Sequence, residues 1–229
     1  MKDLTLVIPA KYESESLPVF LNEINELPCK KIIVLDRSDL KTINAIKNFK
    51  EIEILYQQKK GYGAALIEGI NSTNTLFFCI INADGSMNPS YLANMLQTIE
   101  NNSLDFLFAS RYEKPGGGSD DDDFITSLGN FIFTKIGNIF FSLKITDILF
   151  TYVLGKTKSF NELELTSRDF TLCVEFPIKQ NRKKLHYSTI PSYERSRIGG
   201  KKKVSAFKDG LLILLKMIKM FFIRWTKKL

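Results

Sequence analysis

Acidic side chains follow apolar runs in this sequence at places where a metal ion or a nucleotide could bind. Asp84 stands in Asn82-Ala83-Asp84-Gly85, directly after the apolar run Leu76 to Ile81. A carboxylate beside an amide oxygen can hold Mg²⁺ or Mn²⁺ against a diphosphate, because hard cations take oxygen ligands and share them with substrate phosphates. A plain strand-to-helix turn capped by Asp84 explains the same residues, so both interpretations stay open at this point.

Two further segments have residue types that suit nucleotide binding. Asp36 ends the apolar run Lys31 to Asp36, where a carboxylate can accept hydrogen bonds from a ribose or a nucleobase; a surface or helix-capping aspartate is the alternative. Gly61-Tyr62-Gly63-Ala64-Ala65 opens a helical segment, which permits close approach of an anionic ligand to the positive end of a helix dipole. Its spacing matches neither a Walker nor a Rossmann fingerprint.

The elements that must position these residues alternate along the first half of the chain. The runs that read as strands are Leu4 to Pro9, Lys31 to Asp36, Ile52 to Tyr56, Leu76 to Asn82 and Asp105 to Ser110. The segments with helical spacing between them are Ser16 to Glu26, Leu40 to Lys50, Ala64 to Asn71 and Pro89 to Asn101. This alternation predicts an α/β fold with a mainly parallel central sheet flanked by helices, and ligands in such sheets bind beyond the carboxyl ends of the strands.

The second half begins with a loop that cannot be the interior of a strand or helix. Residues 114–123 read Lys-Pro-Gly-Gly-Gly-Ser followed by four aspartates, and we interpret the acidic run Asp120 to Asp123 as a solvated, mobile loop rather than a metal site. Helical patterns follow over Phe124 to Leu143 and Phe170 to Lys184.

Positive charge is concentrated at the C-terminal end. The net charge is +7, and the segment from Arg195 to Leu229 alone carries eleven Lys or Arg against Asp209. Within it, Ala206 to Trp225 interleaves Leu, Met, Phe and Trp with Lys and Arg at helical spacing. A basic amphipathic helix of this kind is typical of an anionic membrane interface. Packing on the core or on a second subunit is the alternative.

Composition limits the class of protein. With 229 residues, 44% hydrophobic and 25% charged, the chain is neither a disordered tail nor a collagen-like fibre. The widely spaced Cys29, Cys79 and Cys173 predict reduced thiols in a cytoplasmic protein. We expect no signal peptide and no conventional transmembrane span, because the apolar runs are too short. Any membrane contact is therefore expected to be peripheral, at the cytoplasmic face.

Five short motifs in register resemble family 2 glycosyltransferases of the GT-A fold, in particular the polyprenyl-phosphate glycosyltransferases typified by dolichyl-phosphate mannose synthase. The matching segments are Val7-Ile-Pro-Ala-Lys-Tyr-Glu13 ("IPAYNE"), Val34-Leu-Asp-Arg-Ser38 ("VDDGS"), Gly61-Tyr-Gly-Ala-Ala-Leu66 ("GKGAAL"), Asn82-Ala-Asp84 ("DAD"), and Ala109-Ser-Arg-Tyr112 with Gly116-Gly117 ("SRY…GG"). The segment from Arg197 to Lys203 is similar to the family's "RegGkSK".

The resemblance implies an inverting, metal-dependent transfer of a sugar from a nucleotide diphosphate sugar to a polyprenyl phosphate, with Mg²⁺ or Mn²⁺ as cofactor. It implies a donor site made of Pro9, Ala10, Glu13, Asp36, Gly61, Gly63, Asn82, Ala83 and Asp84. It implies that Asp84 and Asn82 hold the metal, and that Arg111, Arg197 and Lys203 bind the acceptor phosphate. Asp84 and Arg111 are then catalytic. Glu175 is the one candidate base, with a structural glutamate as the alternative.

The resemblance also divides the chain. Residues 1–195 would form the GT-A domain, with 1–113 binding the nucleotide sugar and 114–195 the acceptor, and residues 196–229 would bind phosphate and, through 206–225, the membrane surface. Three departures weaken the match: Leu35 and Asn82 replace acidic residues, and Ile-Leu-Phe-Thr-Tyr-Val after Asp147 replaces "SGFR". A glycan or lipid-linked oligosaccharide as acceptor, or a degraded nucleotide-sugar-binding module, are therefore alternatives. Nucleic-acid binding is not expected, because phosphate contact gives no reason for Leu, Phe and Trp at helical spacing.

Overall fold

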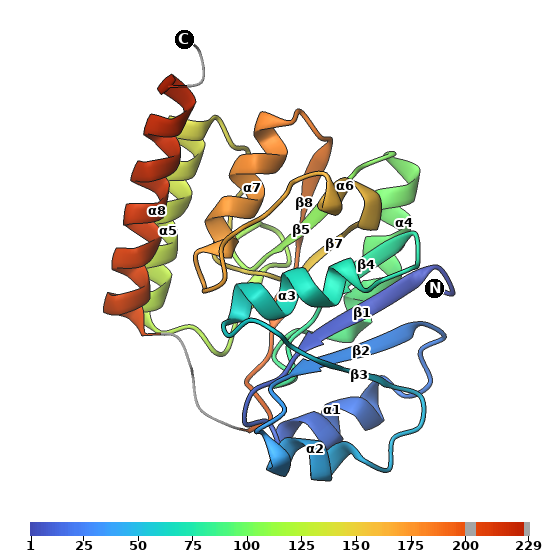
Figure 1. Ribbon diagram of the computed structural model, residues 1–229. Coiled ribbons are helices and arrows are strands. Elements are labelled where there is room, and N and C mark those ends of the chain that lie inside the picture. Colours follow the sequence, from blue (N-terminus) through green and yellow to red (C-terminus); the bar gives the residue numbers. More distant parts are fainter. Residues whose placement is uncertain (200–204, 227–229) are drawn as a thin grey trace.

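The computed structural model describes residues 1–199 and 205–226, with side chains described up to 223 within the last helix. A seven-stranded sheet forms its centre, in the order β3-β2-β1-β4-β7-β5-β8 (Figure 1). The strands are β1 (Leu4–Pro9), β2 (Lys30–Leu35), β3 (Glu53–Tyr56), β4 (Phe77–Ile80), β5 (Phe106–Ser110), β7 (Val153–Lys156) and β8 (Tyr187–Pro191). All neighbouring pairs are parallel except those of β7, which is antiparallel to both β4 and β5. The predicted mainly parallel sheet is confirmed.

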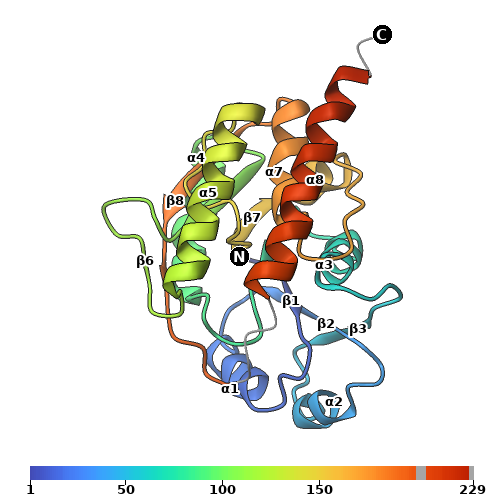
Figure 2. The ribbon, with the colours of Figure 1, turned by 90° about the vertical axis from the view of Figure 1, so that its left-hand side faces the viewer.

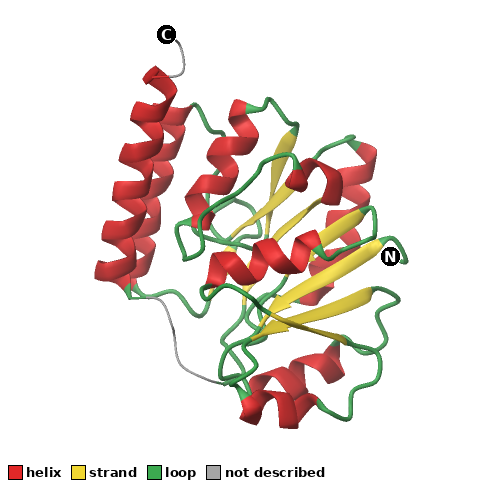
Figure 3. Cartoon of the chain, viewed as in Figure 1, coloured by secondary structure: helices red, strands yellow, loops and turns green. Residues whose placement is uncertain are grey.

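Helices cover both faces of this sheet, giving three layers (Figure 3). The helices are α1 (Ser16–Glu23), α2 (Leu40–Ile46), α3 (Tyr62–Asn71), α4 (Leu92–Asn101), α5 (Phe124–Phe141), α6 (Thr157–Asn161), α7 (Leu172–Arg182) and α8 (Ala206–Thr226), with a 3₁₀ turn η1 (Pro89–Tyr91) before α4. Alternate strand residues point to opposite faces. On β1, Leu4, Leu6 and Ile8 pack with α1, α2 and α4, whereas Val7 packs with α3, α6 and α7.

Two strands of the central sheet and one short helix were not predicted. β7 has only four residues and contains Gly155, whose missing side chain leaves room for the Phe106 ring, since a Cβ there would lie 2.4 Å from it. β8 is an edge strand with mixed burial, and α6 has five residues. Each is too short for hydrophobic periodicity to separate it from a loop.

The loop at 114–123 is held in place by specific contacts. Its β6 (Gly118–Ser119) pairs in parallel with β9 (Tyr193–Glu194), forming a separate two-stranded sheet. Consecutive aspartates have different partners: Asp120 accepts a hydrogen bond from the Tyr193 hydroxyl, and Asp121 pairs with Arg197. Asp122 accepts from the Tyr112 hydroxyl, and Asp123 caps α5 through the Thr126 amide. Asp120 and Asp123 are exposed and Asp121 and Asp122 half-buried, which agrees with the predicted solvated run, whereas the specific partners of all four were not predicted. The mobility of this loop stays a prediction.

Helices α5 and α8 lie side by side at one end of the domain (Figure 2). α8 confirms the predicted C-terminal amphipathic helix: Ile213, Met217 and Met220 are buried against α5 and α7. Among the described residues, α5 is the one helix whose length and apolar composition would suffice to cross a membrane. However, two polar side chains of α5, Asn130 and Thr134, hold the backbone of the following segment. They accept hydrogen bonds from the Leu149 and Ile148 amides, respectively. We therefore assign α5 to the folded domain.

Candidate active site

The loops that follow β1 and β2 are joined at the carboxyl edge of the sheet. The Ala10 amide donates to the Val34 carbonyl at 2.8 Å, and the Tyr12 amide donates to Asp39 Oδ2 at 2.6 Å. Glu13 is buried, and its amide donates to Thr42 Oγ1. Pro9, Ala10 and Glu13 thus lie together at this edge, and their role in donor binding stays a prediction. Asp39, which the sequence analysis missed, joins the two loops and also caps α2.

Asp36 lies at the same edge and is open to solvent on one side. Its Oδ1 accepts hydrogen bonds from the amide and the hydroxyl of Ser38, at 2.8 and 2.7 Å. These bonds, the amide's first, lower the pKa of Asp36. The carboxylate is therefore ionised at neutral pH and can accept hydrogen bonds from a ribose or base.

The Asn82–Asp84 turn follows β4 at this edge. Asp84 Oδ1 accepts from the Ser86 amide at 3.1 Å, while Oδ2 lies 3.8 Å from the Arg197 guanidinium. Arg197 also pairs with Asp121, so it connects the acidic loop to the turn. The structure thus brings Asp84 and Arg197 together, although Arg197 was predicted to bind the acceptor phosphate rather than the donor. Lys203, the other predicted phosphate ligand in this segment, lies outside the described residues.

Asn82 is held by a tyrosine that the sequence analysis did not single out for this role. The Tyr62 hydroxyl donates to Asn82 Oδ1 at 3.1 Å and also lies 2.6 Å from Thr151 Oγ1. Burial raises the pKa of Tyr62, so its hydroxyl stays protonated and available as a donor. Spacing could not reveal this cluster, because residues 62, 82 and 151 come from separate parts of the chain.

The residues of this turn suit a divalent cation that is shared with a substrate diphosphate. Asp84 offers a partly exposed carboxylate oxygen, and Asn82 offers an amide oxygen whose second lone pair is open. In the described part of the chain, no group of three or more His, Cys, Asp or Glu side chains could hold a metal. The protein thus supplies few ligands, as Mg²⁺ sites that also use substrate phosphates do.

The glycines that open α3 serve a different purpose from the predicted one. A Cβ on Gly61 would lie 2.1 Å from the Arg168 carbonyl oxygen, and one on Gly63 would lie 2.5 Å from that of Ser167. The Arg168 carbonyl also accepts the Ala64 amide, capping the helix. The prediction that Gly61 and Gly63 make room for a donor phosphate is therefore corrected: the backbone of residues 167–169 takes that room.

This packing makes Gly61→Ala strongly destabilising. Gly61 has a φ of +121°, which side chains disfavour, and the close carbonyl adds a clash. We expect the free energy of unfolding to fall by about 2–3 kcal/mol in urea titration. Gly129→Ala is the control, because nothing lies within 4 Å of a Cβ in that helical position; it should stabilise by about 0.5–1 kcal/mol. Equal stabilities for the two variants would contradict the packing.

Arg111 is the centre of a buried ion cluster. Its guanidinium forms a two-pronged contact with Asp147 (2.7 and 3.0 Å) and reaches Glu194 at 3.0 Å and Asp122 at 3.3 Å. The Arg111 amide also donates to Asp147. These partners occupy the fork that would bind a phosphate, so the structure gives Arg111 a structural role. Its catalytic and phosphate-binding roles stay predictions.

Glu175 is a buried anchor rather than a base. It accepts the Ser167 amide at 2.6 Å and the Thr166 hydroxyl at 2.9 Å, and it pairs with Lys179 at 3.0 Å and Lys216 at 3.3 Å. Although burial raises the pKa of Glu175, the Ser167 hydrogen bond and both lysines outweigh it and lower the pKa to about 2. A carboxylate with that pKa is a weak base, so the geometry favours the structural alternative.

The depressed pKa makes Glu175 a source of acid sensitivity. Its contribution to stability is fully present above its ordinary pKa of 4.5 and is lost as the pH falls toward about 2. We expect the free energy of unfolding of wild type to fall by about 3 kcal/mol more than that of Glu175→Gln over this pH window. Urea unfolding at pH 5, 4, 3 and 2 measures the difference between the two proteins. A constant difference across that range would contradict the assignment.

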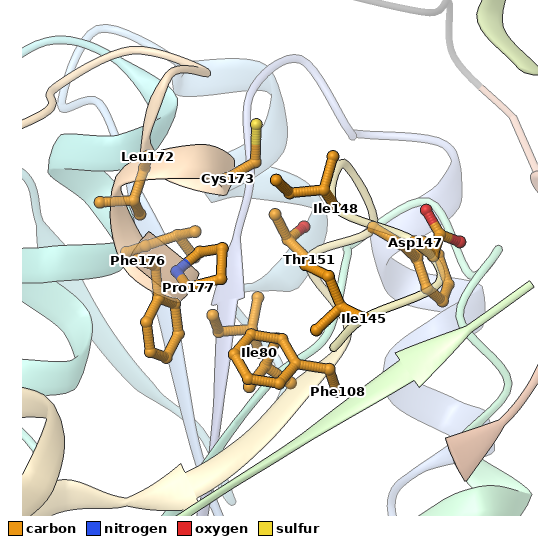
Figure 4. Close-up of a pocket in the computed structure, with 13 residues that line it drawn as sticks. Ile80, Phe108, Ile145, Asp147, Ile148, Thr151, Leu172, Cys173, Phe176 and Pro177 are labelled. Atoms are coloured by element: carbon orange, nitrogen blue, oxygen red, sulfur yellow. The ribbon is translucent and has the colours of Figure 1, made fainter. Parts of the chain in front are cut away.

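A small apolar pocket lies behind this edge, between the segment 145–151 and α7 (Figure 4). Apart from Asp147 and Thr151, its labelled walls are apolar or sulfur-containing. Cys173 is one of them and, like Cys29 and Cys79, is a free thiol, as predicted. The pocket offers no set of donors for a diphosphate, so the polar edge of the sheet is the better candidate site.

The sequence of this chain is similar to those of known proteins. The model of the family described as glycosyl transferase family 2 matches residues 5–164. A Methanococcus voltae protein named UDP-N-acetylglucosamine–dolichyl-phosphate N-acetylglucosaminyltransferase is 26% identical over 225 residues, covering 83% of this chain and 84% of that protein.

Solved structures with the same fold include glucosyl-3-phosphoglycerate synthase from Mycobacterium tuberculosis. Its complex with Mn²⁺, UDP and glucosyl-3-phosphoglycerate superposes with a TM-score of 0.69 at 12% identity, covering 93% of this chain and 79% of that one. Its complex with Mn²⁺ and UDP-glucose gives 0.66 at 12% identity, covering 93% and 78%. The predicted GT-A fold is confirmed by this likeness.

Proposed function

Because this chain belongs to glycosyl transferase family 2, we propose that it transfers a sugar from a nucleotide diphosphate sugar to a polyprenyl phosphate, with a divalent cation at Asp84. One observation carries the donor half of this proposal. The Asp84 carboxylate lies at the carboxyl edge of the sheet, 3.8 Å from the Arg197 guanidinium. A carboxylate that can hold a cation, next to a guanidinium that can bind phosphate oxygens, suits a metal-bound diphosphate leaving group.

Different side chains at this edge would bind different parts of the nucleotide-sugar donor. Asp36 can accept hydrogen bonds from the nucleoside, and the joined loops at Ala10 and Glu13 form the wall beside it. Asp84 and Asn82 would hold the cation, which supplies charge neutralisation for the departing diphosphate. Arg197 can turn from Asp121 to the phosphates, since its fork of donors suits either anion. Attack from the side opposite the diphosphate then inverts the anomeric centre.

A phosphate acceptor requires no general base. A polyprenyl phosphate is already anionic, so its oxygen can attack without general-base help. Glu175 is fully engaged with a loop and two lysines, and no role in proton transfer is needed from it. A hydroxyl acceptor on a glycan would require a base. The name of the Methanococcus voltae relative, a dolichyl-phosphate transferase, supports the same acceptor class.

A joint apolar surface of α5 and α8 supports membrane contact. We call it the α5–α8 surface; its exposed apolar side chains are Phe124, Ile125, Leu128, Phe131, Ile132, Ile139 and Phe140 of α5 and Phe207, Leu211, Leu214, Leu215, Ile218 and Phe222 of α8. Many exposed apolar side chains on two neighbouring helices are typical of an interaction site, and nearby lysines favour anionic lipid. We propose that the protein lies on the cytoplasmic face of the membrane through this surface, and that α5 extends the contact predicted for residues 206–225 alone.

An acceptor panel tests the proposal. Purified enzyme with Mg²⁺ or Mn²⁺ is given labelled UDP-N-acetylglucosamine, UDP-glucose or GDP-mannose with polyprenyl phosphate, with the matching polyprenol, or with a lipid-linked oligosaccharide. We expect label in the organic phase with polyprenyl phosphate only, because the free alcohol needs a base. Transfer to the oligosaccharide alone would support the glycan alternative. Consumption of no donor would support the degraded binding module.

A further inference from the structure

The buried carboxylate of Glu175 lies between two parts of the molecule that the proposed function treats separately. On one side it pairs with Lys216 of α8, at 3.3 Å. On the other side it accepts hydrogen bonds from the backbone amides of Thr166 and Ser167, in the loop before α7. Its side chain is 1% exposed, so it cannot exchange these partners for water without a structural change.

The loop that Glu175 holds is packed against the start of α3. The Arg168 carbonyl accepts the Ala64 amide at 3.0 Å, and the backbone of Ser167 fills the space left by Gly63. A shift of the loop would therefore disturb the first turn of α3, because the Ala64–Arg168 hydrogen bond joins the two backbones and the missing side chain of Gly63 lets them pack closely. The first turn contains Tyr62, whose hydroxyl orients Asn82 beside Asp84.

At the other end, α8 has two different faces. Ile213, Met217 and Met220 are buried against α5 and α7, and Arg182 of α7 reaches the Met220 carbonyl. Leu211, Leu215 and Phe222 are exposed on the α5–α8 surface. Lys216 is thus the residue through which α8 reaches the buried carboxylate. A lipid surface that changes how α8 sits on α7 would change the Lys216–Glu175 distance first.

From this continuous series of contacts we infer that Glu175 is a positioning residue, and that its ion pair with Lys216 couples the seating of α8 to nucleotide affinity at the Asp84 turn. The inference rests on the proposed function, since it needs both a membrane-bound α8 and a nucleotide at Asp84. It assigns Glu175 a role in the reaction without proton transfer. Coupling between sites requires an element whose arrangement both sites influence, and the loop 166–169 is that element.

The test compares two lysines on the same helix. Lys216→Met removes the charge that meets Glu175, and Lys219→Met removes an equal charge from an exposed position three residues further on. Lys216→Arg keeps the charge and serves as the conservative rescue. The dissociation constant for UDP with Mn²⁺ is measured by calorimetry with and without phosphatidylglycerol vesicles, and vesicle binding is measured by flotation. Donor KM and kcat are measured in parallel.

We expect vesicles to tighten UDP binding to wild type, Lys219→Met and Lys216→Arg. Lys216→Met should bind UDP about tenfold more weakly in the presence of vesicles, with donor KM raised and kcat little changed. Lys216→Met combined with Glu175→Gln should be no weaker than Lys216→Met alone. Equal UDP affinities for Lys216→Met and Lys219→Met would overturn the coupling while leaving the proposed function intact. Failure of wild type to bind vesicles or UDP would contradict the proposed function, and the coupling with it.

Discussion

Asp84→Asn is expected to lower kcat/KM for sugar transfer by about three orders of magnitude, because the loss of metal-assisted charge stabilisation is worth several kcal/mol. The substitution keeps the size of the side chain and its ability to accept the Ser86 amide, so the turn should fold. What it removes is the negative charge that would hold the cation next to the diphosphate. Initial rates at nucleotide-sugar concentrations from far below KM to saturation, with polyprenyl phosphate held constant, measure the effect.

Asp121→Asn is the matched control. Asp121 pairs with the same Arg197 guanidinium but belongs to the acidic loop rather than to the edge of the sheet. It should keep most of the transfer activity. Binding of Mn²⁺ in the presence of UDP, followed by electron paramagnetic resonance, should be lost in Asp84→Asn and kept in Asp121→Asn. Undiminished Mn²⁺ binding by Asp84→Asn would show that the metal is not held at this turn.

The largest effect on stability is expected from Arg111→Met. The substitution leaves Asp147 and Glu194 buried without their cation, and breaking a buried ion pair in this way costs about 3–5 kcal/mol. Burial already raises the pKa of Glu194 with Arg111 present, so it will take up a proton more readily without it. Urea unfolding at pH 7 measures the loss.

The double variant Arg111→Met with Asp147→Asn tests the cause of this loss. Removing the charge of the partner should recover part of the stability, since the penalty comes from an uncompensated buried carboxylate. If the double variant instead loses the sum of the stabilities lost by the two single variants, Arg111 acts through its packing on the Phe150 ring. The centre of that ring lies 4.6 Å from the guanidinium carbon.

The first half of the fold could be predicted because its inner parallel strands, β1, β2 and β4, are buried on both faces. β1 was predicted with the bounds Leu4–Pro9 that the structure has, and the others differ by a few residues. In the second half, β7 enters the sheet antiparallel between β4 and β5. That order depends on tertiary packing around Gly155, which leaves no periodic pattern in the sequence.

Some residues of the candidate site could be predicted because they directly follow strands of a parallel sheet. Others were missed because their contacts join segments that are distant in the sequence. Asp36 and Asp84 follow strands, and the carboxyl edge of a parallel sheet brings such residues together. Gly61 was predicted to lie next to a donor phosphate but lies next to the backbone of Arg168. A glycine-rich helix start has the same sequence whether a ligand or another loop approaches it. The partners of the acidic loop were missed for a related reason, since the arginine that pairs with Asp121 lies 76 residues away in the sequence.

The central claim is that a sugar is transferred to the phosphate of a lipid, and phosphorus NMR tests the new bond directly. Enzyme, Mg²⁺, UDP-N-acetylglucosamine and polyprenyl phosphate in detergent are followed in one tube. The account predicts that the phosphomonoester signal of the lipid is replaced by a phosphodiester signal in step with the release of UDP. Release of UDP without that phosphodiester, in a preparation whose donor is consumed, would contradict it.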